Sequence, residues 1–256
     1  MIRMIVTDLD NTLLRSDKSI SEYTIEVLKK CQARGIKVVF ATARSTKSAS
    51  RVLEQFAPDG FIGYGGSLVS AGSEVIHRID IPADISSRII KECLAAPEVT
   101  SVLAINESVA LTNNREDLEI RDTAHYRYAD FSIDYGHRYP KISLTATDPA
   151  AVKKIAAHYP MCGMLRYAGE DLYKFANRDA NKWNAIKVIA AHYNISTDAI
   201  AAFGDDAIDL EMLTNCGMGM AVSNAIAEVK AVAGYICGSN DEDGVAGWLE
   251  GYVLAL

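Results

Sequence analysis

The chain has 256 residues and a formal charge of −7 at pH 7, with 49% hydrophobic and 23% charged residues. This composition is that of an ordinary globular protein and excludes a disordered or low-complexity chain. The length allows one or two domains with a large core, which excludes a disulfide-stapled mini-protein. The acidic balance gives no electrostatic footprint for nucleic acid or an anionic membrane, so we expect neither as a partner.

The five cysteines are odd in number and widely spaced, without a C-x-x-C pair. This pattern predicts neither a disulfide framework nor a zinc cluster. The apolar stretch at the N-terminus is too short for a signal-peptide core, and no later stretch approaches the roughly 20 apolar residues of a membrane span. We therefore expect a cytoplasmic protein, either a monomer or a small homo-oligomer.

The first region alternates strands and helices. The expected elements are a strand at Met4–Thr7, a helix from a capping box at Ser19-x-x-Glu22 to about Ala33, a strand at Ile36–Ala41, a helix with Ala49, Val52, Leu53 and Phe56 on one face, and a strand at Phe61–Ile62. This β-α-β-α-β order predicts a right-handed, doubly wound parallel sheet with helices on both faces.

The order changes in the middle of the chain, between Pro82 and about Arg178. The expected elements there are a helix at Ile85–Ala95, strands at Ser101–Ile105, Val109–Thr112 and Lys141–Ala146, a helix from Pro149 to about His158, and strands at Met164–Tyr167 and Leu172–Ala176 separated by Gly169. Neighbouring strands joined by tight turns predict an antiparallel sheet with helices on one face, which is an α+β domain.

The alternating pattern returns after the middle segment. The expected elements are a helix with Trp183, Ile186, Ala190 and Tyr193 on one face, a strand at Ile200–Phe203, a helix starting over Asp209–Leu213 and closed by Gly217, a strand at Met218–Val222, a helix around Ala225–Ala233, a strand at Tyr235–Cys237 and a helix near Val245–Tyr252. We expect residues 1–81 and 179–256 to form one discontinuous α/β domain, with residues 82–178 inserted as an α+β domain.

Two acidic residues follow the first expected strand. Residues i and i+2 of an extended chain point to the same side, so Asp8 and Asp10 should present two carboxylates beyond the C-terminal edge of the sheet. Open α/β sheets bind their ligands at that edge. Two close carboxylates repel each other unless a cation lies between them, and Mg²⁺ suits such oxygen ligands. On the spacing alone, a pair of solvated loop aspartates is the alternative.

A second acidic cluster, with Asp205, Asp206 and Asp209, follows another apolar strand. Helix capping by Asp205 or Asp206 is the alternative there, and it explains one acid but not three. At the end of the Ile36–Ala41 strand, the hydroxyl and backbone N–H groups of Thr42-Ala43-Arg44 precede a helix, which is a reasonable cradle for a phosphoryl group.

Four segments together resemble the successive signatures of the haloacid dehalogenase-like phosphatases: Asp8–Leu14, Ala41–Arg44, Lys182 and Gly204–Asp209. Met218–Asn224, Ala225 and Asp241–Val245 further resemble the Cof-type subgroup. The resemblance spans the chain from residue 4 to about residue 250. A helix and a strand already fill the stretch between Asp10 and Thr42. The insert therefore lies where the family places its second class of cap, and its α+β pattern is similar to the larger, C2B-like variety.

The resemblance implies hydrolysis of a phosphate ester through an aspartyl-phosphate on Asp8. Asp10 would protonate the leaving oxygen and then accept a proton from the hydrolytic water. Mg²⁺ would be held by Asp8, the backbone carbonyl of Asp10 and Asp205, while Asp209 would orient the waters of the metal.

The resemblance also implies which groups bind the phosphate. Thr42, with the backbone at Leu9 and Ala43, would hydrogen-bond the transferring group, and Lys182 would offset charge between Asp8 and the phosphate. The expected substrate is a small phosphorylated metabolite, in particular a sugar phosphate.

Three positions depart from the subgroup pattern: Ala43 replaces a usual glycine, while Gly65 and Ile208 replace usual asparagines. An asparagine at position 208 would donate a hydrogen bond to the phosphate or the nucleophile. Isoleucine cannot donate one, and losing such a donor costs on the order of a hundredfold in rate. Two alternatives to a phosphatase therefore stay open: a phosphomutase with the same nucleophile, and a weakly active ligand-binding or regulatory protein, which Ile208 favours.

Overall fold

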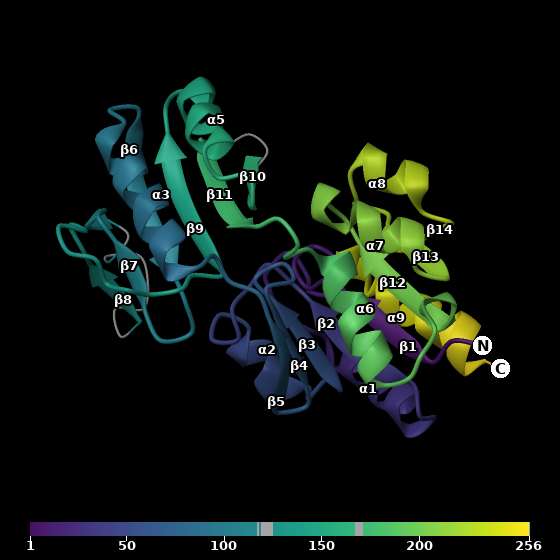
Figure 1. Cartoon of the computed structure of the whole chain (residues 1–256). Coiled ribbons are helices and arrows are strands. Elements are labelled where there is room, and N and C mark those ends of the chain that lie inside the picture. Colours follow the sequence, from purple (N-terminus) through teal and green to yellow (C-terminus); the bar gives the residue numbers. More distant parts are fainter. Residues whose placement is uncertain (117, 119–124, 167–170, 256) are drawn as a thin grey trace. The chain divides into compact units, whose positions relative to one another are not determined.

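The computed structural model describes residues 1–116, 118, 125–166 and 171–255. It forms two compact units (Figure 1). The core unit consists of Met1–Arg78 and Asn181–Leu256, and the insert unit of Ile79–Ala180. In the part of the chain that the structure describes, no helix has the length and apolar character needed to cross a bilayer.

The core unit contains an eight-stranded sheet in the order β14-β13-β12-β1-β2-β3-β4-β5. Its strands are β1 (Met4–Thr7), β2 (Lys37–Ala41), β3 (Gly60–Gly63), β4 (Leu68–Ala71), β5 (Glu74–Arg78), β12 (Ile200–Gly204), β13 (Met218–Val222) and β14 (Tyr235–Cys237). The six strands from β14 to β3 are parallel, which confirms the predicted α/β fold class.

The hairpin formed by β4 and β5 was not predicted. Both strands pair antiparallel, β4 with β3 and β5 with β4, and they extend one edge of the sheet. Their side chains are largely half-buried or exposed, so they lack the apolar run that marks the buried strands. Gly72, with φ at +55°, makes the tight turn between them.

The helices of the core unit confirm the predicted alternation. They are α1 (Glu22–Ala33), α2 (Ser50–Gln55), α6 (Lys182–His192), α7 (Leu210–Asn215), α8 (Ala227–Val232) and α9 (Gly244–Leu249), with a π-helical turn at Glu250–Leu254 and 3-10 turns at Thr197–Ala199, Ala207–Asp209 and Asn240–Glu242. The predicted capping box at Ser19 is wrong. Ser21 caps α1 by accepting from the backbone N–H of Thr24, because the hydroxyl and N–H of Ser19 both bind Asp17.

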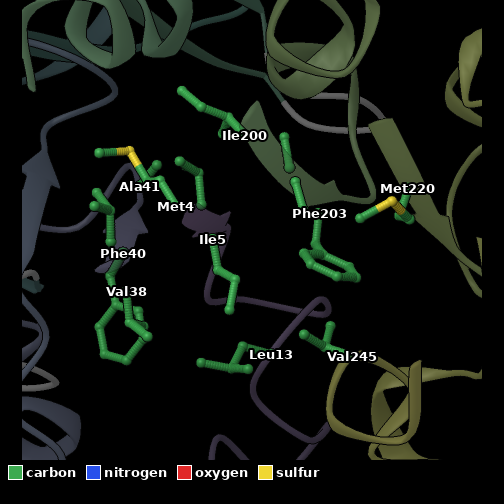
Figure 2. Packing of buried hydrophobic residues seen from close by; sticks show 14 of the residues in the cluster. Met4, Ile5, Leu13, Val38, Phe40, Ala41, Ile200, Phe203, Met220 and Val245 are labelled. Atoms are coloured by element: carbon green, nitrogen blue, oxygen red, sulfur yellow. The ribbon is translucent and has the colours of Figure 1, made fainter. Parts of the chain in front are cut away.

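The hydrophobic core surrounds the central parallel strands (Figure 2). Met4 and Ile5 of β1, Val38 and Phe40 of β2, and Phe203 of β12 are fully buried. Strands covered on both faces carry continuous apolar runs, as these do. The core therefore fixes the positions at which β1, β2 and β12 end.

The insert unit is an α+β domain, as expected. Its six-stranded sheet has the order β10-β11-β9-β6-β7-β8, and all neighbours pair antiparallel except β7 and β8. The strands are β6 (Val99–Ile105), β7 (Ala110–Thr112), β8 (Tyr126–Tyr128), β9 (Lys141–Ala146), β10 (Cys162–Arg166) and β11 (Leu172–Asn177), and the helices are α3 (Ala83–Ala95) and α5 (Pro149–Ala157). Strand β8 was not predicted. Tyr167 and Gly169, which entered the predicted final hairpin, lie outside the described residues.

Candidate active site

Three neighbouring strands bring the predicted acidic and hydroxyl residues to one edge of the core sheet. In the parallel register Thr7 lies opposite Phe203 of β12 and Phe40 of β2. The backbone N–H of Asp8 continues this pairing by donating to the Phe203 carbonyl at 3.0 Å. The segments that begin at Asp8, Asp205 and Thr42 therefore leave the sheet at the same carboxyl edge, where open α/β sheets bind ligands.

A buried lysine joins two of the carboxylates. Lys182 Nζ lies 2.6 Å from Oδ1 of Asp8 and 2.6 Å from Oδ1 of Asp209. The exposed fractions of Lys182, Asp8 and Asp209 are 2%, 6% and 0%. Lys182 is the first residue of α6, whose cap Asn181 accepts from the N–H of Asn184 at 2.7 Å. Buried charges require such pairing, so this lysine ties the helix to the edge of β1.

The structure also brings Asp205 to this cluster. One carboxylate oxygen from each of Asp8, Asp205 and Asp209 lies within 4.8 Å of the other two. Thr12 fixes Asp205 by donating from its hydroxyl to Oδ1 at 2.6 Å. Three hard oxygen donors beside a single ammonium group leave an excess of negative charge, and this donor set fits a divalent cation such as Mg²⁺.

Asp209 organises the loop that carries Asp205. Its Oδ2 accepts from the N–H groups of Asp205 at 3.0 Å and Asp206 at 3.2 Å. A Cβ atom on Gly204 would lie 2.5 Å from the Cβ of Asp209, so glycine permits this close approach. The capping interpretation holds for Asp206, whose side chain accepts from the N–H of Ala207 in a capping box with Asp209. Asp205 instead contributes to the acidic cluster.

The electrostatics of the cluster follow from its burial. Burial raises the pKa of Asp8 from 3.8 to about 7, although Lys182 partly opposes the shift and Asp209 adds to it. Burial likewise raises the pKa of Asp205 to about 6 against the hydrogen bond from Thr12. Burial alone would lower the pKa of Lys182, but the carboxylates of Asp209 and Asp8 outweigh burial and raise it. The lysine is therefore held in its charged form.

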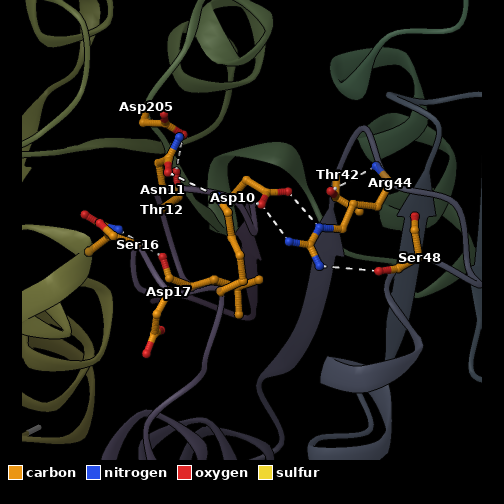
Figure 3. A network of polar contacts seen from close by, with 12 residues as sticks. Asp10, Asn11, Thr12, Ser16, Asp17, Thr42, Arg44, Ser48 and Asp205 are labelled. Atoms are coloured by element: carbon orange, nitrogen blue, oxygen red, sulfur yellow. Dashed lines mark hydrogen bonds and ion pairs between the residues drawn. The ribbon is translucent and has the colours of Figure 1, made fainter. Parts of the chain in front are cut away.

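The Asp10 carboxylate does not belong to this cluster. Arg44 binds it through two nitrogens, at 2.7 and 2.6 Å (Figure 3). Lys18 Nζ lies 3.2 Å from Oδ1 of Asp10. The two carboxylates thus have different partners, since Asp8 binds Lys182 whereas Asp10 binds Arg44 and Lys18. The chain turns after Asp8, where the Leu9 carbonyl accepts from the N–H of Leu14, so the i and i+2 alternation of a strand no longer applies.

Arg44 and Lys18 also set the charge of Asp10. Burial acts to raise the pKa of Asp10, but the hydrogen bond and charge of Arg44, together with Lys18, outweigh burial and lower the pKa. Asp10 is thus an ionised carboxylate in this arrangement. The side chains of Thr12 and Arg44 had no predicted role, although both residues stand inside the quoted motifs. Thr12 is two residues after Asp10, and Arg44 directly follows Ala43.

The expected phosphate cradle lies at the end of β2. Thr42 is buried, its N–H donates to the carbonyl of Ile62 at 2.8 Å, and its hydroxyl accepts from the N–H of Arg44 at 3.2 Å. The Thr42 carbonyl accepts from the N–H of Gly65 at 2.9 Å. Ala43 is half-buried, and the Leu9 side chain is fully buried. The backbone at Ile62 and Gly65 therefore fixes both the N–H and the carbonyl of Thr42.

Two of the departures from the subgroup pattern, Gly65 and Ile208, lie in turns near the site. Gly65 has φ at +73°, a left-handed conformation that glycine and asparagine adopt more readily than other residues. Its neighbour Gly66 packs against Asn181, whose carbonyl oxygen would lie 2.3 Å from an added Cβ. Ile208 is half-buried in the turn between Asp205 and Asp209, where its side chain offers no hydrogen-bond donor.

Several known proteins are similar to this chain over nearly its full length. The 5-amino-6-(5-phospho-D-ribitylamino)uracil phosphatase YitU of Bacillus subtilis (strain 168) is 27% identical over 262 residues, covering 97% of each chain. The HMP-PP phosphatase of Enterobacter sp. (strain 638) is 26% identical, covering 90% of this chain and 88% of its own. The structure of a HAD subclass IIB sugar phosphatase superposes with a TM-score of 0.83 at 23% identity, covering 98% of both chains, which shows a shared fold.

Residues 5–249 match the family model of the haloacid dehalogenase-like hydrolases. The match includes the acidic segments, Lys182 and the inserted domain. It confirms the resemblance drawn from the motifs and the expectation that the protein is an enzyme. The chain therefore belongs to the haloacid dehalogenase-like hydrolases.

Proposed function

We propose that the protein is a phosphatase that hydrolyses a phosphate monoester of a small metabolite, with a sugar phosphate as the expected substrate class. The observation that carries this proposal is the buried Asp8 carboxylate, held 2.6 Å from Lys182 at the carboxyl edge of the sheet. Relatives named as phosphatases, and a sugar phosphatase of the same fold, support the substrate class.

Asp8 is the proposed nucleophile. Lys182 holds its Oδ1, so Oδ2 is the atom that attacks phosphorus in line. The attack forms a bond between Oδ2 and phosphorus and breaks the ester bond to the leaving oxygen. Water then attacks the same phosphorus and releases inorganic phosphate, which restores Asp8.

Asp10 is the proposed proton donor and acceptor. It protonates the leaving oxygen in the first step and accepts a proton from water in the second. Its ion pair with Arg44 keeps Asp10 ionised. To act as the donor, Asp10 must therefore separate from Arg44, take up a proton and then contact the leaving oxygen. Arg44 is then available as a cation beside the cradle at Thr42.

We propose Mg²⁺ as the cofactor, held by the carboxylates of Asp8 and Asp205 and by the backbone carbonyl of Asp10. When bound, the ion supplies charge neutralisation for the phosphoryl oxygens. The Asp209 carboxylate accepts from Lys182 through Oδ1 and from two backbone N–H groups through Oδ2, so it holds Lys182 and the Asp205 loop in place. In the proposal, Asp209 would also orient waters bound to the metal.

The remaining residues bind the transferring group. Thr42 and the backbone N–H groups of Leu9 and Ala43 hydrogen-bond its oxygens, and the Lys182 ammonium offsets the charge that develops between Asp8 and the phosphate. We further propose that residues 82–178 form the cap that selects the substrate, and that the protein acts in the cytoplasm as a monomer or small homo-oligomer.

The test is phosphate release from a panel of phosphorylated metabolites, with Mg²⁺ present and with EDTA. Wild type is expected to release phosphate in Mg²⁺ and to lose this activity in EDTA. Asp8→Asn is nearly isosteric and is expected to be inactive. Wild type that is no more active than Asp8→Asn across the panel would refute the proposal. Phosphate returned to excess substrate, without release, would instead indicate the phosphomutase.

A second candidate function is ligand binding with weak turnover, which Ile208 favours because it supplies no donor beside Asp205. If that missing donor limits the rate, Ile208→Asn should raise kcat by about a hundredfold with little change in KM. An unchanged kcat would show that this position does not limit the reaction.

A further inference from the structure

The loop that follows Asp8 lies outside the helices and the named strands, and an isolated bridge joins Asp10 to Leu14. Residues 9–16, here called the Asp10 loop, carry both Asp10 and Thr12. The N–H groups of Leu13 and Leu14 donate to the carbonyl of Leu9, and Asn11 has φ at +58°. Asparagine adopts this left-handed conformation readily, so the turn itself is not strained, and contacts with the rest of the core unit fix where the loop lies.

Two asparagine side chains from the C-terminal part of the core unit supply that support. The Nδ2 of Asn224 donates to the carbonyl of Asn11 at 2.7 Å, and its Oδ1 accepts from the N–H of Asn240 at 3.0 Å. The Nδ2 of Asn240 donates to the carbonyl of Leu14 at 3.0 Å. Asn224 and Asn240, here called the amide relay, therefore hold two carbonyls of the Asp10 loop.

Carboxylates continue the support along the same loop. Asp241 accepts from the N–H and the hydroxyl of Ser16, at 2.8 and 2.7 Å. Asp243 accepts from two nitrogens of Arg15, at 2.6 and 3.3 Å. The loop is thus fixed at Asn11, Leu14, Arg15 and Ser16 by side chains more than 200 positions away in sequence.

The relay needs the amide group itself. Asn224 donates to a carbonyl and accepts from an N–H with the same side chain, which a carboxylate or a methyl group cannot do. Asn224 is also exposed, so burial does not account for its place in the structure. Asn224 holds the carbonyl of Asn11, the residue that directly follows Asp10. The next residue, Thr12, donates the hydrogen bond to Asp205.

We propose that Asn224 and Asn240 are positioning residues that hold the Asp10 loop so that the Asp10 carboxylate meets the leaving oxygen. This inference rests on the proposed function, in which Asp10 is the proton donor. The relay anchors the loop one residue beyond Asp10, while the Asp8 N–H to Phe203 bond anchors the chain two residues before it. Loss of the outer anchor loosens the loop beside Asp10, while the anchor at Asp8 stays in place.

The first measurement is hydrogen exchange in the Asp10 loop of the full chain, which does not depend on activity. Asn224→Ala should speed exchange of these amides by about tenfold, because it removes hydrogen bonds that close the loop. Asn215→Ala is the matched control, since Asn215 is also exposed and its Nδ2 donates to a backbone carbonyl, that of Glu211, at 2.7 Å. Unchanged exchange in Asn224→Ala would overturn the relay as the support of the loop.

The second measurement compares two leaving groups. A sugar phosphate needs a proton on its leaving oxygen, whereas p-nitrophenyl phosphate releases a stable phenolate without one. Asn224→Ala should lower kcat for the sugar phosphate by about tenfold to a hundredfold, and for p-nitrophenyl phosphate by a few-fold at most. KM should change little for either substrate, and Asn215→Ala should resemble wild type with both.

A double variant separates positioning from general damage. In an Asp10→Asn background, Asn224→Ala should cause little further loss with the sugar phosphate, because the group that it positions is already absent. Equal loss with both substrates, or an undiminished effect in the Asp10→Asn background, would overturn the proposal. Wild type that hydrolyses neither substrate would overturn the proposed function. Hydrogen exchange in the Asp10 loop would still decide whether the amide relay supports the loop.

Discussion

Replacing Lys182 by Met tests whether one ammonium group keeps two buried carboxylates in place. Methionine retains an apolar stem but removes the charge that lies 2.6 Å from both Asp8 and Asp209. Removing one partner of a buried ion pair costs about 3–5 kcal/mol, because the remaining charge stays buried without compensation. For a domain of this size, that cost lowers the melting temperature by about 6–20 °C.

The cost should depend on pH through Asp8. Burial raises the pKa of Asp8 from 3.8 to about 7, so between these values the folded protein binds this proton more tightly than the unfolded chain does. The stability that this proton contributes is therefore complete below pH 3.8 and is lost as the pH rises through 7. Protonated Asp8 carries no charge to compensate, so Lys182→Met should destabilise the protein less at pH 5 than at pH 8.

The assay is thermal unfolding followed by circular dichroism, in EDTA at both pH values and again with Mg²⁺ at pH 8. Mg²⁺ should restore part of the stability of Lys182→Met, because a cation that binds the folded carboxylates favours the folded state. Lys187→Met is the matched control on the exposed side of α6. A Lys182→Met protein that melts within about 2 °C of wild type at pH 8 in EDTA would refute the reasoning.

Two further substitutions test the acidic cluster by other routes. Gly204→Ala places a Cβ 2.5 Å from the Cβ of Asp209, so it should destabilise the protein by about 1–3 kcal/mol and weaken Mg²⁺ binding. Gly247→Ala is the control, because its Cβ meets open space and should change neither property. Equal melting temperatures of the two variants would contradict this expectation. Thr12→Val removes the 2.6 Å hydrogen bond to Asp205 and should raise the dissociation constant of Mg²⁺ about tenfold by calorimetry, whereas an unchanged constant would show that Asp205 needs no such support.

The parallel part of the core unit was predictable because its strands carry continuous apolar runs. Met4–Thr7 and Ile200–Phe203 are buried on both faces, and the structure places them side by side. The β4 and β5 hairpin escaped prediction because its strands are short and half-exposed, so neither apolar runs nor strict alternation marks them. The cap of α1 was misplaced for a local reason, since Ser19 and Ser21 are both good capping residues and Asp17 decides between them.

Three members of the acidic cluster, Asp8, Asp205 and Asp209, were predictable, but their hydrogen-bond partners were not, and the expected fourth acid, Asp10, binds Arg44 instead. Strand order alone brings Asp8 and Asp205 to one edge, and the motifs identify Lys182 and Asp209. The sequence did not indicate that both oxygens of Asp209 are held by Lys182 and by backbone N–H groups. Such contacts depend on how a turn closes after the strand, which apolar patterning does not encode.

Asp10 shows that a sequence motif can identify a residue without predicting where its side chain points. The motif places Asp10 two residues after Asp8, but the turn that starts at Leu9 brings its carboxylate to Arg44, in the segment that follows β2. Side chains from the C-terminal part of the chain, Asn224 and Asn240, hold this turn in position. A proton donor that must leave one partner and meet another needs a backbone that does not move with it, and side chains distant in sequence supply that rigidity here. The C-terminal segments that hold Asn224 and Asn240 thus have a physical reason to accompany the N-terminal motif, because they hold the loop that carries Asp10, the proposed proton donor.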